Sequence, residues 1–296
     1  GLCYCILSMK NSIIAIYLPD SKNFINQFLG LYYSVVFKTN LHEKFDFLVS
    51  GPSSIKDKIP TDHCHFVEVE DLSANPKLCY RYSGNSYGYV NSFIPFVDDK
   101  CKEILSKYEY CLRLDVDTFV CPGLNDIQCA KDEIVVGNAA YSSETARIRL
   151  PQILAQLNLA DQNIHNIGST WYGSTDNMIT YGALTIDYVK YFLENHFSEH
   201  EGSWPQWYGG VILLYAGHLA LNSSPLKINK TDKLDYYSTS DNEVTDYYTL
   251  HCWHTDAFFS KHWYMNDRYK DRESVPTSLK CNEYSYDCIT KGVEEL

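Results

Sequence analysis

Runs of apolar and polar residues alternate along the chain in a way that predicts strands followed by amphipathic helices. Residues 13–18 form an apolar run of strand length, and a helix is predicted to open at Pro19. The apolar side chains of that helix fall on one face: Phe24, Phe28, Leu31, Tyr32 and Val35. Further apolar runs predict strands at residues 45–49, which end at a turn over 50–52, and at 66–69.

The same pattern continues through the rest of the chain. A helix from about residue 90 to 105 carries one apolar stripe and leads into a strand at 110–114. The later predictions are a strand at 133–136, a helix at 150–159, a Gly/Ser/Asn-rich segment at 166–176, helices at 185–197 and 209–221, and a strand at 247–253. Strands that alternate with helices predict an α/β fold with a mostly parallel central sheet. Ligands of such sheets collect at the carboxyl ends of the strands.

Composition narrows the class of protein. A chain of 296 residues with 45% hydrophobic residues can bury one large core. Its net charge of −12, without a cluster of Lys and Arg, argues against a nucleic-acid partner. No apolar run approaches the roughly 20 residues that cross a bilayer, so we expect no membrane span within this chain. Composition leaves the oligomeric state open.

The eleven cysteines do not define the cellular compartment. They include no Cys-x-x-Cys pair and no regular spacing of zinc ligands. Neighbouring cysteines could form bridges in an oxidising compartment: Cys101 with Cys111, Cys121 with Cys129, and Cys281 with Cys288. Sequons at Asn222 and Asn229 point weakly to the secretory pathway. Both the cytoplasm and the secretory lumen therefore stay possible.

Two carboxylates follow the strand at 110–114. In an extended strand Asp115 and Asp117 point the same way, while Val116 faces the opposite layer. Two oxygen ligands on one face, with coordination positions left open, suit Mn²⁺ or Mg²⁺ shared with a phosphate-bearing substrate. An Asp-x-Asp pair alone is common on solvated surface, and the apolar strand before it is what favours a site.

The segment 110–120, Tyr-Cys-Leu-Arg-Leu-Asp-Val-Asp-Thr-Phe-Val, resembles the Asp-x-Asp strand of glycosyltransferases with the GT-A fold. Residues 202–215 resemble the acceptor-side loop and helix of that family, and residues 250–261 resemble its closing segment. Uncharacterised proteins of algae and large DNA viruses are the nearest in this resemblance. It implies one catalytic domain over residues 1–265, with a nucleotide-sugar half at about 10–120, an acceptor half at 121–265, and a surface tail at 266–296.

The resemblance also implies roles for individual side chains near the donor. A His at a strand end would complete the metal site, and Lys261 would reach the diphosphate. His251 and His254 are both candidates for the metal ligand, because a strand puts them on opposite faces and its end is not fixed by the sequence. Tyr17 and Arg81 are predicted to contact the nucleotide, although Arg81 is equally well explained as a surface cation stacked on a tyrosine.

The acceptor side is predicted from aromatic and acidic residues. Rigid aromatic faces stack on sugar rings, so we expect Trp171, Trp204 and Trp207 to line it. A carboxylate is needed to take the acceptor proton in inverting transfer, or to lie beside the anomeric carbon in retaining transfer. Glu201 and Asp176 are the candidates that chain order favours, and Glu199 and Asp256 remain alternatives.

Together these residues predict a metal-dependent transferase. It would move a hexose or pentose from a nucleoside-diphosphate sugar, UDP favoured over GDP, to a glycan or other hydroxyl acceptor, with Mn²⁺ or Mg²⁺ as the cofactor. Two alternatives remain: a catalytically inactive sugar-binding module that keeps the fold, and a metal-dependent phosphoesterase that uses Asp115 and Asp117.

Overall fold

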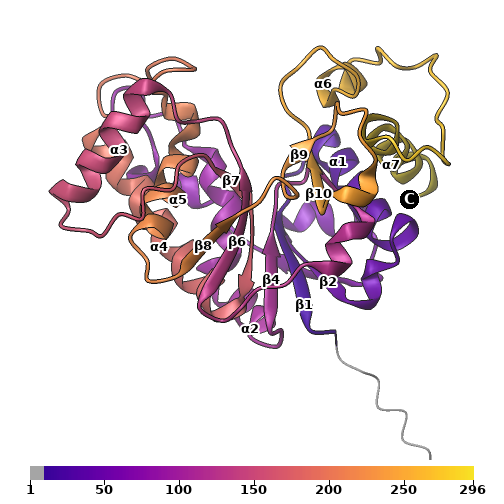
Figure 1. Cartoon of the computed structure of the whole chain (residues 1–296), viewed down its shortest axis with the longest axis horizontal. Helices are drawn as coiled ribbons and strands as arrows, with labels where there is room; N and C mark the ends of the chain where they lie inside the picture. Colours follow the sequence, from indigo (N-terminus) through magenta and orange to yellow (C-terminus); the bar gives the residue numbers. More distant parts are fainter. Residues whose placement is uncertain (1–9) are drawn as a thin grey trace, which may run out of the picture.

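The computed structural model describes residues 10–296, and its centre is a seven-stranded sheet in the order β3-β2-β1-β4-β7-β6-β8 (Figure 1). The strands are β1 (Ser12–Tyr17), β2 (Phe45–Gly51), β3 (Cys64–Glu68), β4 (Tyr110–Arg113), β6 (Glu133–Asn138), β7 (Ile167–Ser174) and β8 (Lys227–Lys230). Only β7 runs antiparallel to its neighbours, so the predicted mostly parallel α/β sheet is confirmed.

Helices cover both faces of this sheet. The helices of the described residues are α1 (Lys22–Tyr33), α2 (Asp99–Leu105), α3 (Glu144–Gln156), α4 (Thr175–Asn195), α5 (Ile212–Asn222), α6 (Lys261–Met265), which lies apart from the large sheet, and α7 (Cys281–Glu295). Figure 1 shows α3, α4 and α5 on one side of the sheet and α1 and α7 on the other. Side chains of β1 alternate between the two layers, since Ile13 and Ala15 join one buried cluster while Ile14 and Ile16 join the other.

A second, three-stranded sheet lies beside the first in the order β5-β10-β9. It contains β5 (Thr118–Val120), β9 (Tyr236–Tyr237) and β10 (Thr249–His251). Strand β5 follows β4 after a short turn, so the small sheet begins where a central strand of the large one ends. The predicted strand at 247–253 is therefore present in a shorter form, and its last residue is His251.

Two segments differ from the sequence-based expectation because of local breaks and tertiary pairing. The predicted helix at about 90–105 is divided into a 3₁₀ segment, Gly88–Phe96, and α2, because Pro95 cannot continue a helical ladder and Asp98 caps α2. The Gly/Ser/Asn-rich segment at 166–176 is mostly strand β7, which hydrogen-bonds to β4 and β6 on its two sides. Pairing on both sides supplies the stability that its glycines and serines lack.

The C-terminal residues are more than a surface tail. Helix α7 packs closely on α1, where a Cβ added at Gly292 would lie 2.4 Å from the carbonyl oxygen of Leu29. The side chains of Cys281, Cys288 and Ile289 are buried in a third apolar cluster with Phe119 of β5. The predicted tail at 266–296 thus contributes a helix to the core beside the small sheet.

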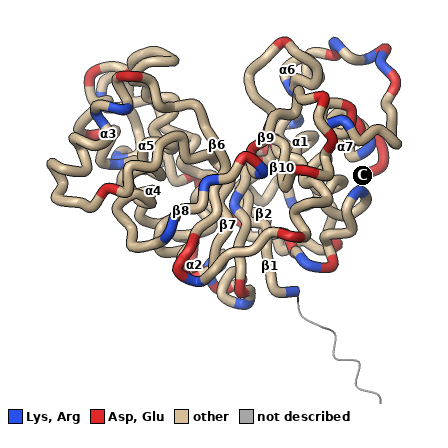
Figure 2. Tube along the Cα trace, viewed as in Figure 1, with Lys and Arg blue, Asp and Glu red and all other residues tan. Residues whose placement is uncertain are grey.

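Three remaining sequence observations also have structural counterparts. All cysteines within residues 10–296 are free thiols, so none of the three neighbouring pairs is bridged. In the same residues no helix is long and apolar enough to span a membrane. Lys and Arg are dispersed among Asp and Glu along the trace in the view of Figure 2.

Candidate metal and nucleotide site

Asp115 and Asp117 lie in the turn between β4 and β5, at the carboxyl end of β4. The strand predicted at 110–114 ends at Arg113 in the structure, so the two carboxylates lie beyond it and strand alternation does not align them. Leu114 and Val116 are instead buried in one apolar cluster and fix the turn. Asp115 and Asp117 both line a cavity at the carboxyl ends of the strands, which is where ligands of such sheets bind.

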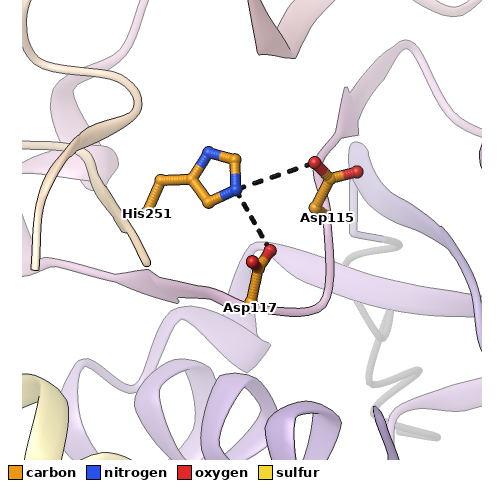
Figure 3. A group of neighbouring side chains, drawn as sticks. All are labelled: Asp115, Asp117 and His251. Atoms are coloured by element: carbon orange, nitrogen blue, oxygen red, sulfur yellow. Dashed lines mark ion pairs between the residues drawn. The ribbon is translucent and has the colours of Figure 1, made fainter. Parts of the chain in front are cut away.

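His251 reaches the same place from a segment that is distant in the sequence. Strand β10 pairs antiparallel with β5 and sets His251 opposite Thr118, and the Cys252 N–H donates to the carbonyl oxygen of Asp117 at 3.0 Å. The Nε2 atom of His251 lies 3.1 Å from a carboxylate oxygen of Asp117 and 3.7 Å from one of Asp115 (Figure 3).

This group of side chains fits a divalent cation. One ligand atom from each of Asp115, Asp117 and His251 lies within 4.8 Å of the others, and no second such group occurs within the described residues. Two carboxylates and one imidazole suit Mn²⁺ or Mg²⁺, and three protein ligands leave coordination positions for substrate oxygens. The structure therefore favours His251 over His254, whose ring stacks on His262 at a centroid distance of 4.4 Å.

Charges in the site are strongly coupled. Burial by itself would raise the pKa of Asp117, but the neighbouring Lys261 and His251 lower it below its usual value. Burial opposes the charge of Lys261 and His251 as well, yet Asp117 raises the pKa of both. Lys261 forms an ion pair with Asp117, so a cation from the closing segment lies directly beside the carboxylates.

Two charged side chains that contact these residues were not predicted from the sequence. Arg113 is 1% exposed, donates to Asp115 at 2.8 Å, and stacks on Phe93 at 4.5 Å. A charged residue inside the apolar strand at 110–114 was the available signal, because a buried cation needs a partner. The other is Asp235, which contacts His251 at 3.1 Å and comes from a polar stretch that carries no local signal.

A cavity of about 760 Å³ opens beside the carboxylates. Several residues predicted to bind donor, metal or acceptor line it: Tyr17, Asp115, Asp117, Trp171, His251, His254 and Lys261. Tyr17 lies at the carboxyl end of β1, next to β4 in the sheet. Trp171 contributes one edge only, since it is 2% exposed and its indole N–H donates to the Gly168 carbonyl at 3.1 Å.

The other predicted residues do not line this cavity. Arg81 is a surface cation, as the alternative held, but the partner that the structure gives it is Glu194 at 2.7 Å and not a tyrosine ring. Trp207 is 7% exposed and stacks on Tyr215 at 4.5 Å, so it belongs to the apolar core, whereas Trp204 is exposed to solvent. These positions do not support the predicted nucleotide role of Arg81 or the sugar-stacking role of the two tryptophans.

The two carboxylates predicted for catalysis have different positions. Asp176 lies in the first turn of α4, just after Ser174, which pairs with the first residue of β4. Asp176 therefore lies at the amino end of β4, whereas Asp115 follows the carboxyl end of this strand. This placement does not support a role in transfer. Glu201 lies near Tyr80, whose hydroxyl is 3.5 Å away, and near Gly209, the neighbour of cavity-lining Gly210.

Comparisons with known proteins agree with this fold. The model of a family described as "Domain of unknown function (DUF7164)" matches residues 8–292. No curated protein sequence matches the chain.

Among solved structures, the galactosyltransferase LgtC in complex with donor and acceptor sugar analogs matches with a TM-score of 0.51 and 12% identity, over 96% of each chain. An active-site mutant of LgtC matches with a TM-score of 0.52 and 11% identity, over 88% of this chain and 95% of its own. A glycosyltransferase involved in glycosylation of the PBCV-1 major capsid has a TM-score of 0.44 and 12% identity, over 90% of this chain and 100% of its own. The likeness to LgtC identifies the fold as GT-A.

Proposed function

The chain belongs to the DUF7164 family, and we propose that it is a metal-dependent glycosyltransferase that uses a nucleoside-diphosphate sugar, with UDP favoured over GDP. The observation that carries the proposal is the convergence of Asp115, Asp117 and His251 at the edge of a cavity that Lys261 also lines. The acceptor would be a glycan or another hydroxyl compound.

The reaction requires the acceptor oxygen to bond to the anomeric carbon while the bond from that carbon to the diphosphate oxygen breaks. A divalent cation held by the three ligands, Mn²⁺ or Mg²⁺, would supply Lewis-acid stabilisation of the negative charge on the leaving diphosphate. Lys261 would donate a charge-assisted hydrogen bond to the same group, and for this it must leave Asp117.

The remaining residues supply position and shape. Arg113 holds one oxygen of Asp115 at 2.8 Å, which orients the carboxylate and leaves its second oxygen directed toward His251. Tyr17 would contact the nucleotide at the carboxyl end of β1, and Trp171 would form part of the wall around the sugar. Glu201 stays our candidate for the carboxylate near the acceptor hydroxyl, because it lies beside the cavity-lining loop at Gly210.

A panel of UDP-sugars and GDP-sugars, incubated with the protein and Mn²⁺, tests this function directly. A glycosyltransferase shows slow hydrolysis of one donor, and both EDTA and the Asp115→Asn/Asp117→Asn double variant abolish it. Asp187→Asn is the matched control, since this carboxylate is exposed on α4 away from the cavity. Hydrolysis of many phosphate esters would favour a phosphoesterase, and sugar binding without any turnover would favour an inactive binding module.

A further inference from the structure

Asp235 is a buried carboxylate just before β9, with a side chain that is 1% exposed. The hydroxyl of Thr170 donates to its Oδ1 at 2.6 Å, and the N–H of the same residue donates to its Oδ2 at 3.0 Å. Its own N–H donates to the hydroxyl of Thr249 at 3.0 Å. These bonds tie the carboxylate to strand β7 of the large sheet and to strand β10 of the small one.

The surrounding backbone is shaped around this carboxylate. A Cβ added at Gly137 would lie 2.2 Å from Oδ2 of Asp235, and one added at Gly168 would lie 2.3 Å from it. Only glycine at both positions leaves room for the oxygen. Asp235 itself has a φ of +54°, a left-handed conformation that costs energy for most residues and that Asp tolerates better than most. The fold thus holds this side chain in one place at some cost.

The ionic partner of Asp235 is the metal-site histidine. Within residues 10–296 no Lys or Arg forms an ion pair with it, and its one titratable contact is His251 Nδ1, 3.1 Å from Oδ1. A buried carboxylate is costly to keep unless a specific partner compensates it. A purely structural carboxylate would also be expected to pair with a permanent cation, as Asp287 does with Lys38.

We propose that Asp235 is a positioning residue, which orients His251 for metal binding. When Nδ1 of His251 donates its proton to Asp235, the opposite ring atom, Nε2, is left with a lone pair directed at the space beside Asp115 and Asp117. Such a carboxylate fixes both the tautomer and the orientation of the ring, and its loss costs about 10- to 100-fold in metal affinity.

This inference rests on the metal site of the proposed function, so its test measures metal binding and does not depend on turnover. Free Mn²⁺ is quantified by its electron paramagnetic resonance signal in titrations of the purified chain. Asp235→Asn keeps the shape of the side chain but turns an amide NH₂ toward at least one of the three donors, which are the Thr170 hydroxyl, the Thr170 N–H and His251 Nδ1. We expect it to raise the dissociation constant of Mn²⁺ about 10- to 100-fold. Thr170→Val, which removes one support and keeps the charge, should have a smaller effect.

A double-mutant cycle separates positioning from a general effect on the fold. If Asp235 acts through His251, the variant with both Asp235→Asn and His251→Ala binds Mn²⁺ no more weakly than His251→Ala alone. Asp287→Asn is the matched control, because this carboxylate is equally buried and ion-paired but lies on α7. It should lower the melting temperature and leave the affinity for Mn²⁺ unchanged.

The outcomes distinguish this inference from the proposed function. Unchanged Mn²⁺ affinity in Asp235→Asn, or a further loss of affinity in the double variant, overturns the positioning role while the metal site stands. A wild-type chain that does not bind Mn²⁺ overturns the metal site, and the positioning role falls with it. Weaker Mn²⁺ binding in Asp235→Asn, together with a double variant that binds Mn²⁺ as well as His251→Ala alone does, supports both.

Discussion

Replacing Lys261 by Met should change metal binding and nucleotide binding in opposite directions. Methionine keeps the length of the side chain, which is 16% exposed, and removes the charge that now neutralises Asp117. The pKa of Lys261 is raised by Asp117 despite its burial, so the wild-type side chain is a cation at neutral pH. A metal ion that binds Asp117 must displace this cation, whereas a bound diphosphate gains it as a partner.

The magnitude follows from the bonds that are exchanged. Hydrogen bonds to charged groups contribute about 1.5–3 kcal/mol, and each 1.4 kcal/mol corresponds to tenfold in affinity. Loss of the contact between Lys261 and the diphosphate should therefore weaken UDP binding about 10- to 100-fold in saturating Mn²⁺. Loss of the competing ion pair should tighten the binding of Mn²⁺ alone by about tenfold, the lower end of the same range.

Titration calorimetry measures the affinity for UDP, and electron paramagnetic resonance of free Mn²⁺ measures the affinity for the metal, on the same preparation. Lys44→Met is the matched control, because this lysine is half-buried outside the cavity and should change neither affinity. A parallel loss of both affinities with a lowered melting temperature would show that Lys261 serves the fold and would refute the exchange of partners. Unchanged UDP affinity would refute the diphosphate contact.

Three further predictions follow from buried or distant groups. Trp207→Ala should lower the free energy of unfolding by about 3–5 kcal/mol in urea titrations and leave UDP affinity unchanged, because this ring packs in the core and not in the cavity. Burial lowers the pKa of His218 to about 3, so the unfolded chain binds a proton that the folded chain excludes; stability should fall as pH drops from about 6.5 toward 3, and less steeply in His218→Asn. Glu201→Gln should reduce transfer to an acceptor by about 10²-fold. Asp176→Asn should retain wild-type turnover in the same assay, because Asp176 lies at the end of the strands opposite to the cavity.

Local patterns in the sequence were sufficient for the framework of the fold. Buried strands such as β1 and β2 are continuous apolar runs, and α1 shows its buried face as a helical stripe, so the α/β sheet could be predicted from periodicity. The pair Asp115 and Asp117 could be located because an apolar strand leads directly into it. These features depend only on residues that are close together in the chain, and the sequence shows such residues directly.

The tertiary structure decided which distant side chains meet. The pairing of β10 with β5 selects His251 as the partner of the carboxylates, and the left-handed turn at Asp235 brings a third carboxylate to the far side of its ring. Packing also placed Trp207 in the core, although an aromatic ring of this kind also suits a sugar site. Strands β5 and β10 lie far apart in the chain, and all three contacts depend on strand order, register or close packing, which no local pattern of residues contains.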